Sequence, residues 1–355
     1  MNLHVPGIKL LRLMLVLAAV AASAAVVKGE DTPAAAPVPI PEAVQKAAES
    51  TPPPGPDQVI IGAYINDIHE LDFRSHSYAV DLYVWFRWHN EASNPVKSLE
   101  FMNRYSPTDH QRDSLLAKPK PMPDGTFYGI IREQGRFSAK FRLERYPFDR
   151  QTLKVVFEDQ AASSVEQTYA VQETPVQINP ELTLPGYQVG VPTLTITPNT
   201  YPTNFGDISL KNNETYSRVT IGIPVSRPLL TVSIKTFVPI LLIIICSTLV
   251  FFVRPSYVEG RIGLAITALL TLVALHLTAS SSLPDVDYLM VIDKAYLASY
   301  AFIIAALTRV VVTSAGAGEP LSDVRISAGD KRWAMVLVAG YTAILAASLA
   351  WTFFR

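Results

Sequence analysis

Four apolar segments in the C-terminal third of the chain restrict its fold more than any other feature. Each is long enough to cross the hydrocarbon core of a bilayer as an α-helix. They cover residues 236–253, 262–282, 289–312 and 333–353. With their flanks, they predict helices over about residues 229–253, 259–282, 287–313 and 332–354. We therefore expect residues 228–355 to form an all-α membrane domain of four helices.

The second of these segments carries a graded stripe along one helical face. The stripe begins with a carboxylate, continues through small and apolar side chains and ends in a hydroxyl. Its members follow one another in steps of four and three residues: Glu259, Gly263, Thr267, Leu270, Ala274, Leu277 and Ser281. Several copies around an axis would line a water-filled pore with a charged mouth and a hydrophobic constriction. The alternative is an ordinary membrane helix whose small residues pack against its neighbours.

The region before the membrane segments, residues 58–227, has the pattern of a β-domain. Residues 78–88 alternate apolar and polar side chains, as a half-buried strand does. Pro, Gly, Asn and Asp separate this run from the other strand-like runs. These are residues 59–68, 126–134, 137–143, 152–158, 187–197 and 216–224. About eight to ten strands in such a length indicate an all-β sandwich.

The N-terminal residues predict export from the cytoplasm. Lys9 and Arg12 precede an apolar run and then small residues, which is typical of a signal peptide over residues 1–25. A short anchor helix is the alternative. Residues 26–57 are rich in Ala and Pro and predict a linker without a core. The single cysteine excludes a disulfide within one chain and favours a bacterial envelope.

Charge between the apolar segments predicts the orientation in the membrane. Arg254 and Arg261 lie between the first two segments, and the connection between the last two is also basic. Residues 282–288, after the second segment, contain Asp285 and Asp287 and no Lys or Arg. Because basic connections stay in the cytoplasm, we expect a multi-pass protein of the bacterial inner membrane with its β-domain in the periplasm.

The order of these parts and three motifs resemble the pentameric ligand-gated ion channels, or Cys-loop receptor superfamily, and above all its prokaryotic members. Tyr-Pro-Phe-Asp-Arg-Gln at residues 146–151 looks like the aromatic-Pro-aromatic-Asp signature of the family. Arg-Pro-Leu-Leu at residues 227–230 is similar to the entry into the first helix, and residues 282–288 to the connection after the second. The cysteines that bracket the signature elsewhere would fall at Ala139 and Leu153, and both are absent, as in prokaryotic members.

The resemblance implies a homopentamer with five copies of Glu259 at the cytoplasmic mouth of the pore. A ring of carboxylates attracts cations, so we expect a channel selective for monovalent cations. Leu270 and Leu277 would form apolar rings that stop ions by dewetting, and Arg261 would point behind the pore. Residues 260–267 also resemble the corresponding helix of glycine and GABA receptors, which conduct anions, so an anion-selective channel is an alternative.

The resemblance also implies three groups of site residues. The gating interface, where sandwich meets membrane, would contain Asp72, Phe148, Asp149, Arg227, Pro284 and Tyr288. The ligand site would lie between neighbouring sandwiches, lined by aromatic rings that hold a cationic or polar ligand. Its candidates are Trp85, Trp88, Phe101, Tyr128, Tyr201 and Phe205. Since some prokaryotic members open on a pH change, His76 and His276 are candidate pH sensors.

Other classes of function fit the sequence less well. A net charge of −1 without a basic block argues against a nucleic-acid partner. We find no catalytic motif, cofactor motif or metal-ligand spacing, so the chain is not expected to be an enzyme. A non-conducting envelope receptor remains an alternative, although an anchor helix has no need of Glu259. A transporter would be expected to show internal repeats.

The sequence thus predicts a ligand-gated channel whose partners are its own copies, membrane lipids, monovalent ions and an agonist. The agonist would be a small molecule or the proton.

Overall fold

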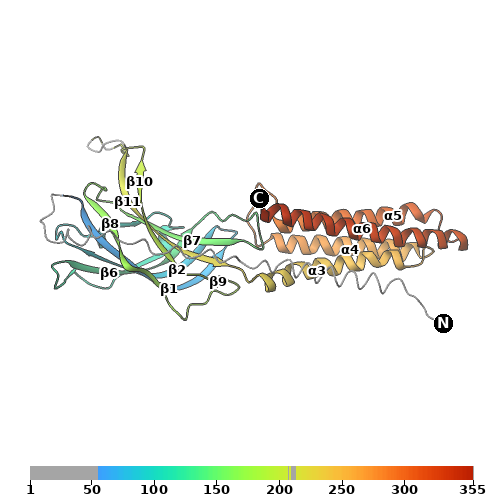
Figure 1. The fold of residues 1–355 in the computed structure, drawn as a ribbon, viewed down its shortest axis with the longest axis horizontal. Coiled ribbons are helices and arrows are strands. Elements are labelled where there is room, and N and C mark those ends of the chain that lie inside the picture. Colours follow the sequence, from blue (N-terminus) through green and yellow to red (C-terminus); the bar gives the residue numbers. More distant parts are fainter. Residues whose placement is uncertain (1–54, 207, 209–212, 355) are drawn as a thin grey trace. The chain divides into compact units, whose positions relative to one another are not determined.

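The computed structural model describes residues 55–206, 208 and 213–354, which divide into two compact units (Figure 1). The predicted signal peptide and nearly all of the predicted linker lie outside the described residues. One unit contains the strands. The other contains the helices together with residues 141–150, the segment that carries most of the family signature.

The strand unit is a sandwich of two sheets (Figure 1). The first sheet has the order β4-β6-β2-β1-β8, with β5 paired to β6, and the second has the order β10-β11-β7-β3, with β9 paired to β11. The first contains β1 (Asp57–Asp72), β2 (Ser77–Trp88), β4 (His110–Ser114), β5 (Lys120–Pro121), β6 (Phe127–Ser138) and β8 (Gln167–Ile178). The second contains β3 (Leu99–Phe101), β7 (Arg150–Asp159), β9 (Gln188–Val189), β10 (Thr193–Tyr201) and β11 (Glu214–Ser226). Short helical turns, α2 (Pro95–Ser98) and η2 (Pro107–Asp109), precede β3 and β4.

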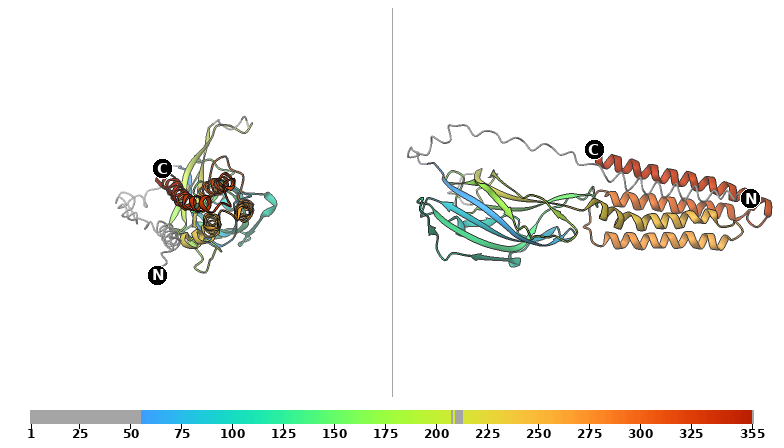
Figure 2. Two further views of the ribbon diagram at one scale, coloured as in Figure 1. Left: turned by 90° about the vertical axis from the view of Figure 1, so that its right-hand side faces the viewer. Right: turned by 60° about the horizontal axis from the view of Figure 1, so that its bottom comes forward.

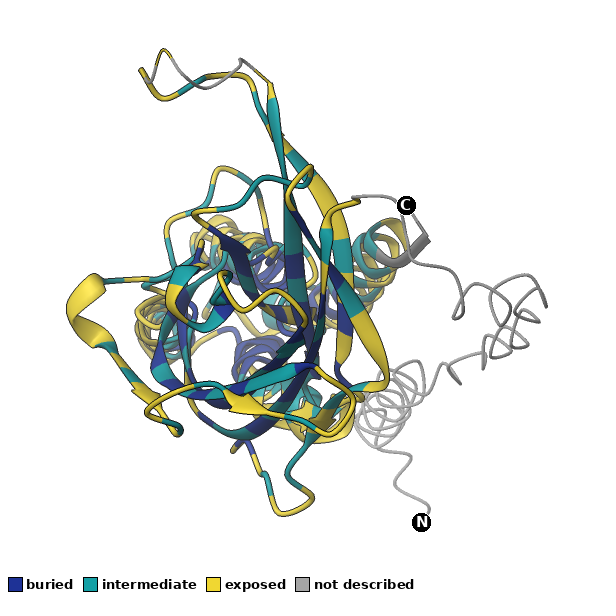
Figure 3. Cartoon of the chain, turned by 90° about the vertical axis from the view of Figure 1, so that its left-hand side faces the viewer, coloured by how far each residue is buried: buried dark blue, intermediate teal, exposed yellow. Residues whose placement is uncertain are grey.

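The core lies between the two sheets because alternate residues of each strand point inward. Val59, Ile61, Ala63 and Ile65 of β1 are fully buried, as are the matching positions of β2, β7 and β11. Figure 3 shows this alternation of buried and more exposed positions along the strands. The sandwich is therefore held mainly by burial of β-branched and aromatic side chains.

Several strand predictions differ from the structure. The strands β3, β4 and β5 are not among those predicted, and the predicted strand over residues 187–197 is divided into β9 and β10. β6 runs without interruption across Gly135, where we predicted two strands, and its pairing with β2 continues on both sides of that glycine. β8 was not predicted at all. It is an edge strand parallel to β1, and residues 171–174 are exposed, so the apolar alternation that identifies a strand is missing there.

The helical unit contains four long helices that lie side by side in Figure 2. They are α3 (Leu229–Leu249), α4 (Val258–Ser280), α5 (Val291–Ser314) and α6 (Pro320–Phe354), with a short turn, η3 (Val250–Phe252), continuing α3. Each is long and apolar enough to span a membrane. α5 packs against the other three and has the largest buried share.

The fourth helix begins about twelve residues earlier than predicted, at Pro320 instead of residue 332. The connection before it therefore shortens to residues 315–319. Proline is well suited to the first turn of a helix, where its missing N–H is not needed. The Asp323 carboxylate accepts a hydrogen bond from the Gly318 amide at 2.9 Å, which fixes the entry to the helix. The predicted fold class, a β-sandwich followed by four membrane-length helices, is confirmed.

Candidate pore, coupling loop and ligand site

The predicted stripe of α4 is the exposed face of that helix in a single subunit. All seven of its residues, from Glu259 to Ser281, are exposed. The buried residues of α4 are Arg261, Ala265, Ala268 and Leu272. At 100° per residue these lie on the side of the helix opposite the stripe. The bundle therefore packs on one face of α4 and leaves the graded face uncovered.

Within the stripe, the two leucines have highly exposed side chains. Leu270 is 64% exposed and Leu277 is 67% exposed, one above the other on the helix. The hydroxyl of Thr267 donates to the carbonyl oxygen of Gly263 at 2.8 Å, so it keeps its own oxygen available to water. When several copies surround an axis, a face of this kind would form rings of polar side chains that hold water and rings of apolar side chains that exclude it.

Arg261 lies on the buried face of α4, away from Glu259. Its guanidinium donates to the carboxylate of Asp330 in α6 and to the carbonyl oxygen of Val250 at 3.2 Å. Asp330 also accepts a hydrogen bond from Arg309 of α5 at 3.0 Å, and Arg309 lies over the ring of Trp333. Arg261 and Asp330 are each about 1% exposed. The Asp330 carboxylate thus compensates the buried positive charge of Arg261, which is two residues from Glu259 in the sequence.

The signature loop forms a compact cluster with the start of α3. Asp149 lies 3.6 Å from Arg227, and the Arg227 guanidinium lies 5.0 Å from the centroid of the Tyr146 ring. Phe148 stacks on Phe237 of α3, with ring centroids 5.8 Å apart and planes at 11°. Three of the residues predicted for gating, Phe148, Asp149 and Arg227, therefore lie together.

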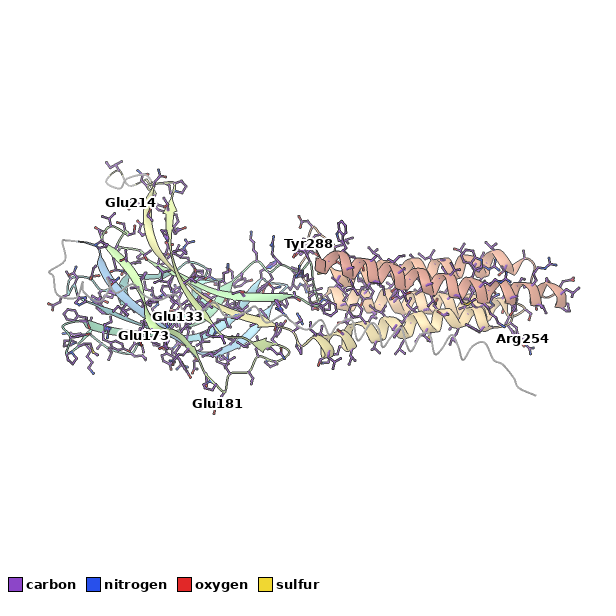
Figure 4. All side chains as sticks on the ribbon, viewed as in Figure 1. Glu133, Glu173, Glu181, Glu214, Arg254 and Tyr288 are labelled. Carbon is purple, nitrogen blue, oxygen red and sulfur yellow. The ribbon has the colours of Figure 1, made fainter. Side chains whose placement is uncertain are left out.

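Tyr288, in the connection between α4 and α5, contacts the same loop. Its hydroxyl accepts a hydrogen bond from the Leu143 amide at 2.9 Å, and the Ile292 amide donates to the carbonyl oxygen of Tyr146 at 3.3 Å. Tyr288 and Arg254 mark opposite ends of the bundle in Figure 4. Pro284 is half-buried in the same connection.

Asp72 belongs to the strand unit, where it is the last residue of β1 and precedes the turn to β2. It accepts hydrogen bonds from the Ser75 hydroxyl at 2.7 Å and from the Arg74 amide at 2.9 Å. The Ser75 hydroxyl, helped by the Arg74 amide and opposed by partial burial, holds the pKa of Asp72 below its usual value. The carboxylate thus fixes the shape of its own turn.

Two of the aromatic ligand candidates lie in the core of the sandwich. Trp88 is 1% exposed and donates its indole N–H to the carbonyl oxygen of Ser93 at 2.8 Å. Phe101 is 4% exposed and packs edge-on against Phe137 and Phe157. A ligand would have to enter the packed core to reach either ring.

Two others lie on the outer side of the first sheet. Trp85 and Tyr128 are half-buried, on neighbouring strands β2 and β6. The Trp85 ring lies across Gly62 of β1, where a Cβ would overlap it, and its indole N–H donates to Gln172 at 3.3 Å. A glycine at position 62 is therefore needed for this ring to lie flat on the sheet.

The last two candidates lie at the hairpin between β10 and β11, where the ring centroids of Tyr201 and Phe205 are 5.3 Å apart. The Tyr201 hydroxyl donates to Glu158 of β7 at 2.9 Å and accepts from Arg218 at 3.1 Å. Burial, and then the hydrogen bond to Glu158, raise the pKa of Tyr201 above its usual value.

Sequence reasoning missed two members of this hairpin cluster. Tyr216 packs edge-on against Tyr201 at 5.8 Å, and Glu158 is buried and also bound by Arg218. Glu158 could have been noticed as a charged residue inside an apolar strand pattern. Figure 4 marks Glu214, which accepts a hydrogen bond from Tyr216 and begins β11 opposite Tyr201, the last residue of β10.

The two histidine candidates have different surroundings. His76 is half-buried in the β1–β2 turn, with its backbone at a φ of 54°. His276 lies off the stripe of α4. Its ring stacks on Tyr296 of α5 at 4.3 Å, and its Nδ1 lies 3.2 Å from the Tyr300 hydroxyl. Within the part of the chain that the structure describes, no group of three His, Cys, Asp or Glu residues is placed to hold a metal ion.

Comparison with known proteins finds similarity to a bacterial ion channel and to animal receptor subunits. No family model matches the chain. It is 24% identical over 280 residues to a proton-gated ion channel of Gloeobacter violaceus, covering 74% of this chain and 75% of that protein. It is 22% identical over 270 residues to the human gamma-aminobutyric acid receptor subunit gamma-3, and 24% identical over 277 residues to the bovine subunit alpha-2. These matches cover 71% and 70% of this chain, which spans 56% and 58% of the two receptor subunits.

The relatives include both a bacterial channel and animal receptor subunits, and the matched region is long enough to take in parts of both the sandwich and the four-helix bundle. The chain belongs to the pentameric ligand-gated ion channel, or Cys-loop receptor, superfamily.

Proposed function

We propose that five copies of this chain form a cation-selective channel, opened by a small molecule or by protons acting on the sandwich. The exposed stripe of α4 is the observation that carries the proposal. A leucine on a membrane helix can face lipid, whereas the carboxylate of Glu259 on the same face could do so only at a large cost in free energy. A face that combines Glu259 with the leucines and Thr267 suits a shared axis filled with water better than it suits lipid.

The selectivity proposal rests on the charges near the cytoplasmic mouth. Glu259 is exposed on the stripe, whereas Arg261 is buried and bound by Asp330. Five exposed carboxylates in a narrow mouth would raise the local concentration of cations. Because Arg261 is directed away and partly neutralised, it would oppose this field weakly.

For the ligand site, we propose the hairpin aromatics Tyr201, Phe205 and Tyr216 of one subunit, facing Trp85 and Tyr128 of the next. The exposed ring of Phe205 and the half-buried rings of the others provide faces for a cationic group, and the tyrosines provide hydroxyls for a polar one. The Glu158 carboxylate is already bound by Arg218, so its role would be to hold the Tyr201 hydroxyl in place. A ligand that closes the hairpin would favour one state of the channel only if it binds that state more tightly.

For the location, we propose the bacterial inner membrane, with the sandwich in the periplasm. The connection between α3 and α4 carries Arg254, and the first turns of α6 carry Arg325, Lys331 and Arg332. This end of the bundle would therefore remain in the cytoplasm. The opposite end, which carries Asp285, Asp287 and Tyr288, would face the periplasm.

The test is the current through a planar bilayer that contains the purified protein, under a salt gradient, while the pH is stepped across the acid and neutral range. We expect a current that reverses toward the cation equilibrium potential. Glu259→Gln should move the reversal potential toward zero, whereas Glu319→Gln, which neutralises an exposed carboxylate beside the start of α6, should not. Reversal toward the chloride potential in the unaltered protein would overturn cation selectivity. If the protein forms pentamers but carries no current at any pH, with or without added small amines as trial agonists, a non-conducting receptor would be favoured.

A further inference from the structure

A buried histidine and a buried glutamate, neither of them a predicted site residue, meet in the sandwich, and the two arginines beside them lie over the ring of the ligand candidate Phe101. His110 begins β4, the edge strand of the first sheet, where it pairs with Gly135 of β6, and Glu133 lies two residues away on β6, opposite Arg112. The side chains of His110 and Glu133 are 2% and 0% exposed. Figure 4 marks Glu133 within the sandwich.

Both ring nitrogens of His110 face hydrogen-bond acceptors. Nδ1 lies 2.9 Å from a carboxylate oxygen of Glu133, and Nε2 lies 2.7 Å from the carbonyl oxygen of Arg136. A neutral imidazole has one N–H and one bare nitrogen, so it satisfies only one of these acceptors when Glu133 is ionised. Both contacts are hydrogen bonds only when one additional proton is present, on His110 or shared with Glu133.

Two further charged groups lie beside the pair of His110 and Glu133. Arg112 of β4 donates to Glu133 at 2.8 Å, and Arg104, in the segment before β4, donates to it at 3.3 Å. Two guanidinium groups thus surround one carboxylate, and a protonated His110 adds a third positive charge. The side chain of Arg136 is directed elsewhere, to Glu70 and Ser77.

The ring of His110 has no room to turn away when the proton leaves. It lies against Gly135, where a Cβ would overlap it, and it meets Phe137 edge-on at 5.0 Å. Without the proton, a bare nitrogen would face either the carboxylate or the carbonyl oxygen at short range. The strain would therefore fall on the contact between β4 and β6.

The same cluster connects the two sheets. Arg112, held by Glu133, donates to the carbonyl oxygen of Leu99 at 2.9 Å. Leu99 begins β3, which belongs to the second sheet. A change at Glu133 would therefore reach β3 as well as β4.

We propose that His110 and Glu133 form a proton-binding site whose occupancy sets how firmly β4 is held to β6 and, through Arg112, to β3. The bound form is the tight one. This site is separate from His76 and His276 and does not depend on whether the pentamer conducts.

The proposal is tested by amide hydrogen–deuterium exchange of the full-length protein in lipid nanodiscs, at about pH 5.5 and about pH 8.5, on either side of the usual histidine range. Because intrinsic amide exchange is base-catalysed, labelling times are shortened at the higher pH so that intrinsic exchange is equal at the two pH values. After this correction, exchange of residues 110–114 should be about tenfold faster at the higher pH, as expected for the loss of one buried hydrogen bond. Residues 99–101 should follow in the same direction.

Three variants make the result specific. His110→Gln does not titrate, so exchange of residues 110–114 should become independent of pH. Glu133→Gln can donate its amide N–H to Nδ1 while Nε2–H keeps the Arg136 carbonyl, so the pH dependence should vanish there also. His89→Gln, at an exposed histidine, should behave as the unaltered protein.

Equal scaled protection at both pH values in the unaltered protein would overturn the proposal. A pH dependence that survives in His110→Gln would do the same, because another group would then be responsible. If His110→Gln does not assemble, the unaltered protein and Glu133→Gln still decide the outcome.

Discussion

Asp330 of α6 binds the guanidinium of Arg261 of α4, and the two side chains are almost completely buried. This pair joins helices that are 69 residues apart in the sequence. The carboxylate of Asp330 also accepts a hydrogen bond from Arg309 of α5, which holds it in place. Asp330 therefore determines which way Arg261 points.

The first prediction concerns this pair. Asp330→Asn leaves the buried guanidinium of Arg261 and the half-buried guanidinium of Arg309 without a carboxylate, so we expect a loss of roughly 3–5 kcal/mol in stability. Thermal unfolding of the detergent-solubilised protein measures it. Asp287→Asn, the same change at an exposed position, should leave the unfolding temperature nearly unaltered. Equal unfolding of the two variants would mean that the buried pair contributes nothing net.

The second prediction concerns the apolar ring proposed at Leu270. Leu270→Ser should wet the constriction and raise the current in the absence of agonist several-fold, because a hydroxyl ring no longer excludes water. Leu269→Ser makes the same change one residue away and off the stripe, and it should not raise the resting current. Single-channel recording at fixed pH distinguishes them. A larger resting current in Leu269→Ser would move the pore to another face of α4.

The third prediction concerns Arg227. Its guanidinium lies over the Tyr146 ring and near Asp149, an arrangement that needs a flat cation. Arg227→Lys keeps the charge but loses the stacking, so we expect the agonist or proton concentration for half-maximal current to rise about tenfold. Arg142→Lys, at an 89% exposed side chain in the same segment, serves as the control. An unchanged concentration response in Arg227→Lys would show that charge alone matters there.

The fourth prediction concerns acid stability of the sandwich. Asp81 of β2 is buried, which by itself would raise its pKa, but hydrogen bonds from Arg132 and Asn66 outweigh burial and lower the pKa below the usual 3.8. A carboxyl group whose pKa is lower in the folded state than in the unfolded chain stabilises the fold at pH values above its unfolded-state pKa. This contribution is lost as the pH falls through its folded-state pKa.

Asp81→Asn should therefore cost about 1–2 kcal/mol near neutral pH, and this difference should shrink as the pH falls below about 4. Tryptophan fluorescence during denaturant unfolding at several pH values measures it. Asp113→Asn, at an exposed position of β4, should show no such convergence. A constant difference at every pH would mean that Asp81 acts through packing alone.

Several features of the fold were predictable because they depend on local pattern. Four long apolar segments determine four helices, since a backbone in lipid must satisfy its own hydrogen bonds. Alternation determines that β1, β2, β7 and β11 are half-buried strands. The steps of four and three from Glu259 to Ser281 determine that these residues share a face wherever the helix lies.

Tertiary structure decided what no local pattern contains. It showed that the stripe is the face of α4 that the bundle leaves uncovered, and that Asp330 turns Arg261 to the other side. It placed the aromatic residues Trp88 and Phe101 in the core while leaving Tyr201 at the hairpin. It brought Glu133 against His110 through pairing of β4 with β6. Such contacts join residues far apart in the chain, and which of them form depends on how whole strands and helices pack, so residue order alone specifies the elements but not their partners.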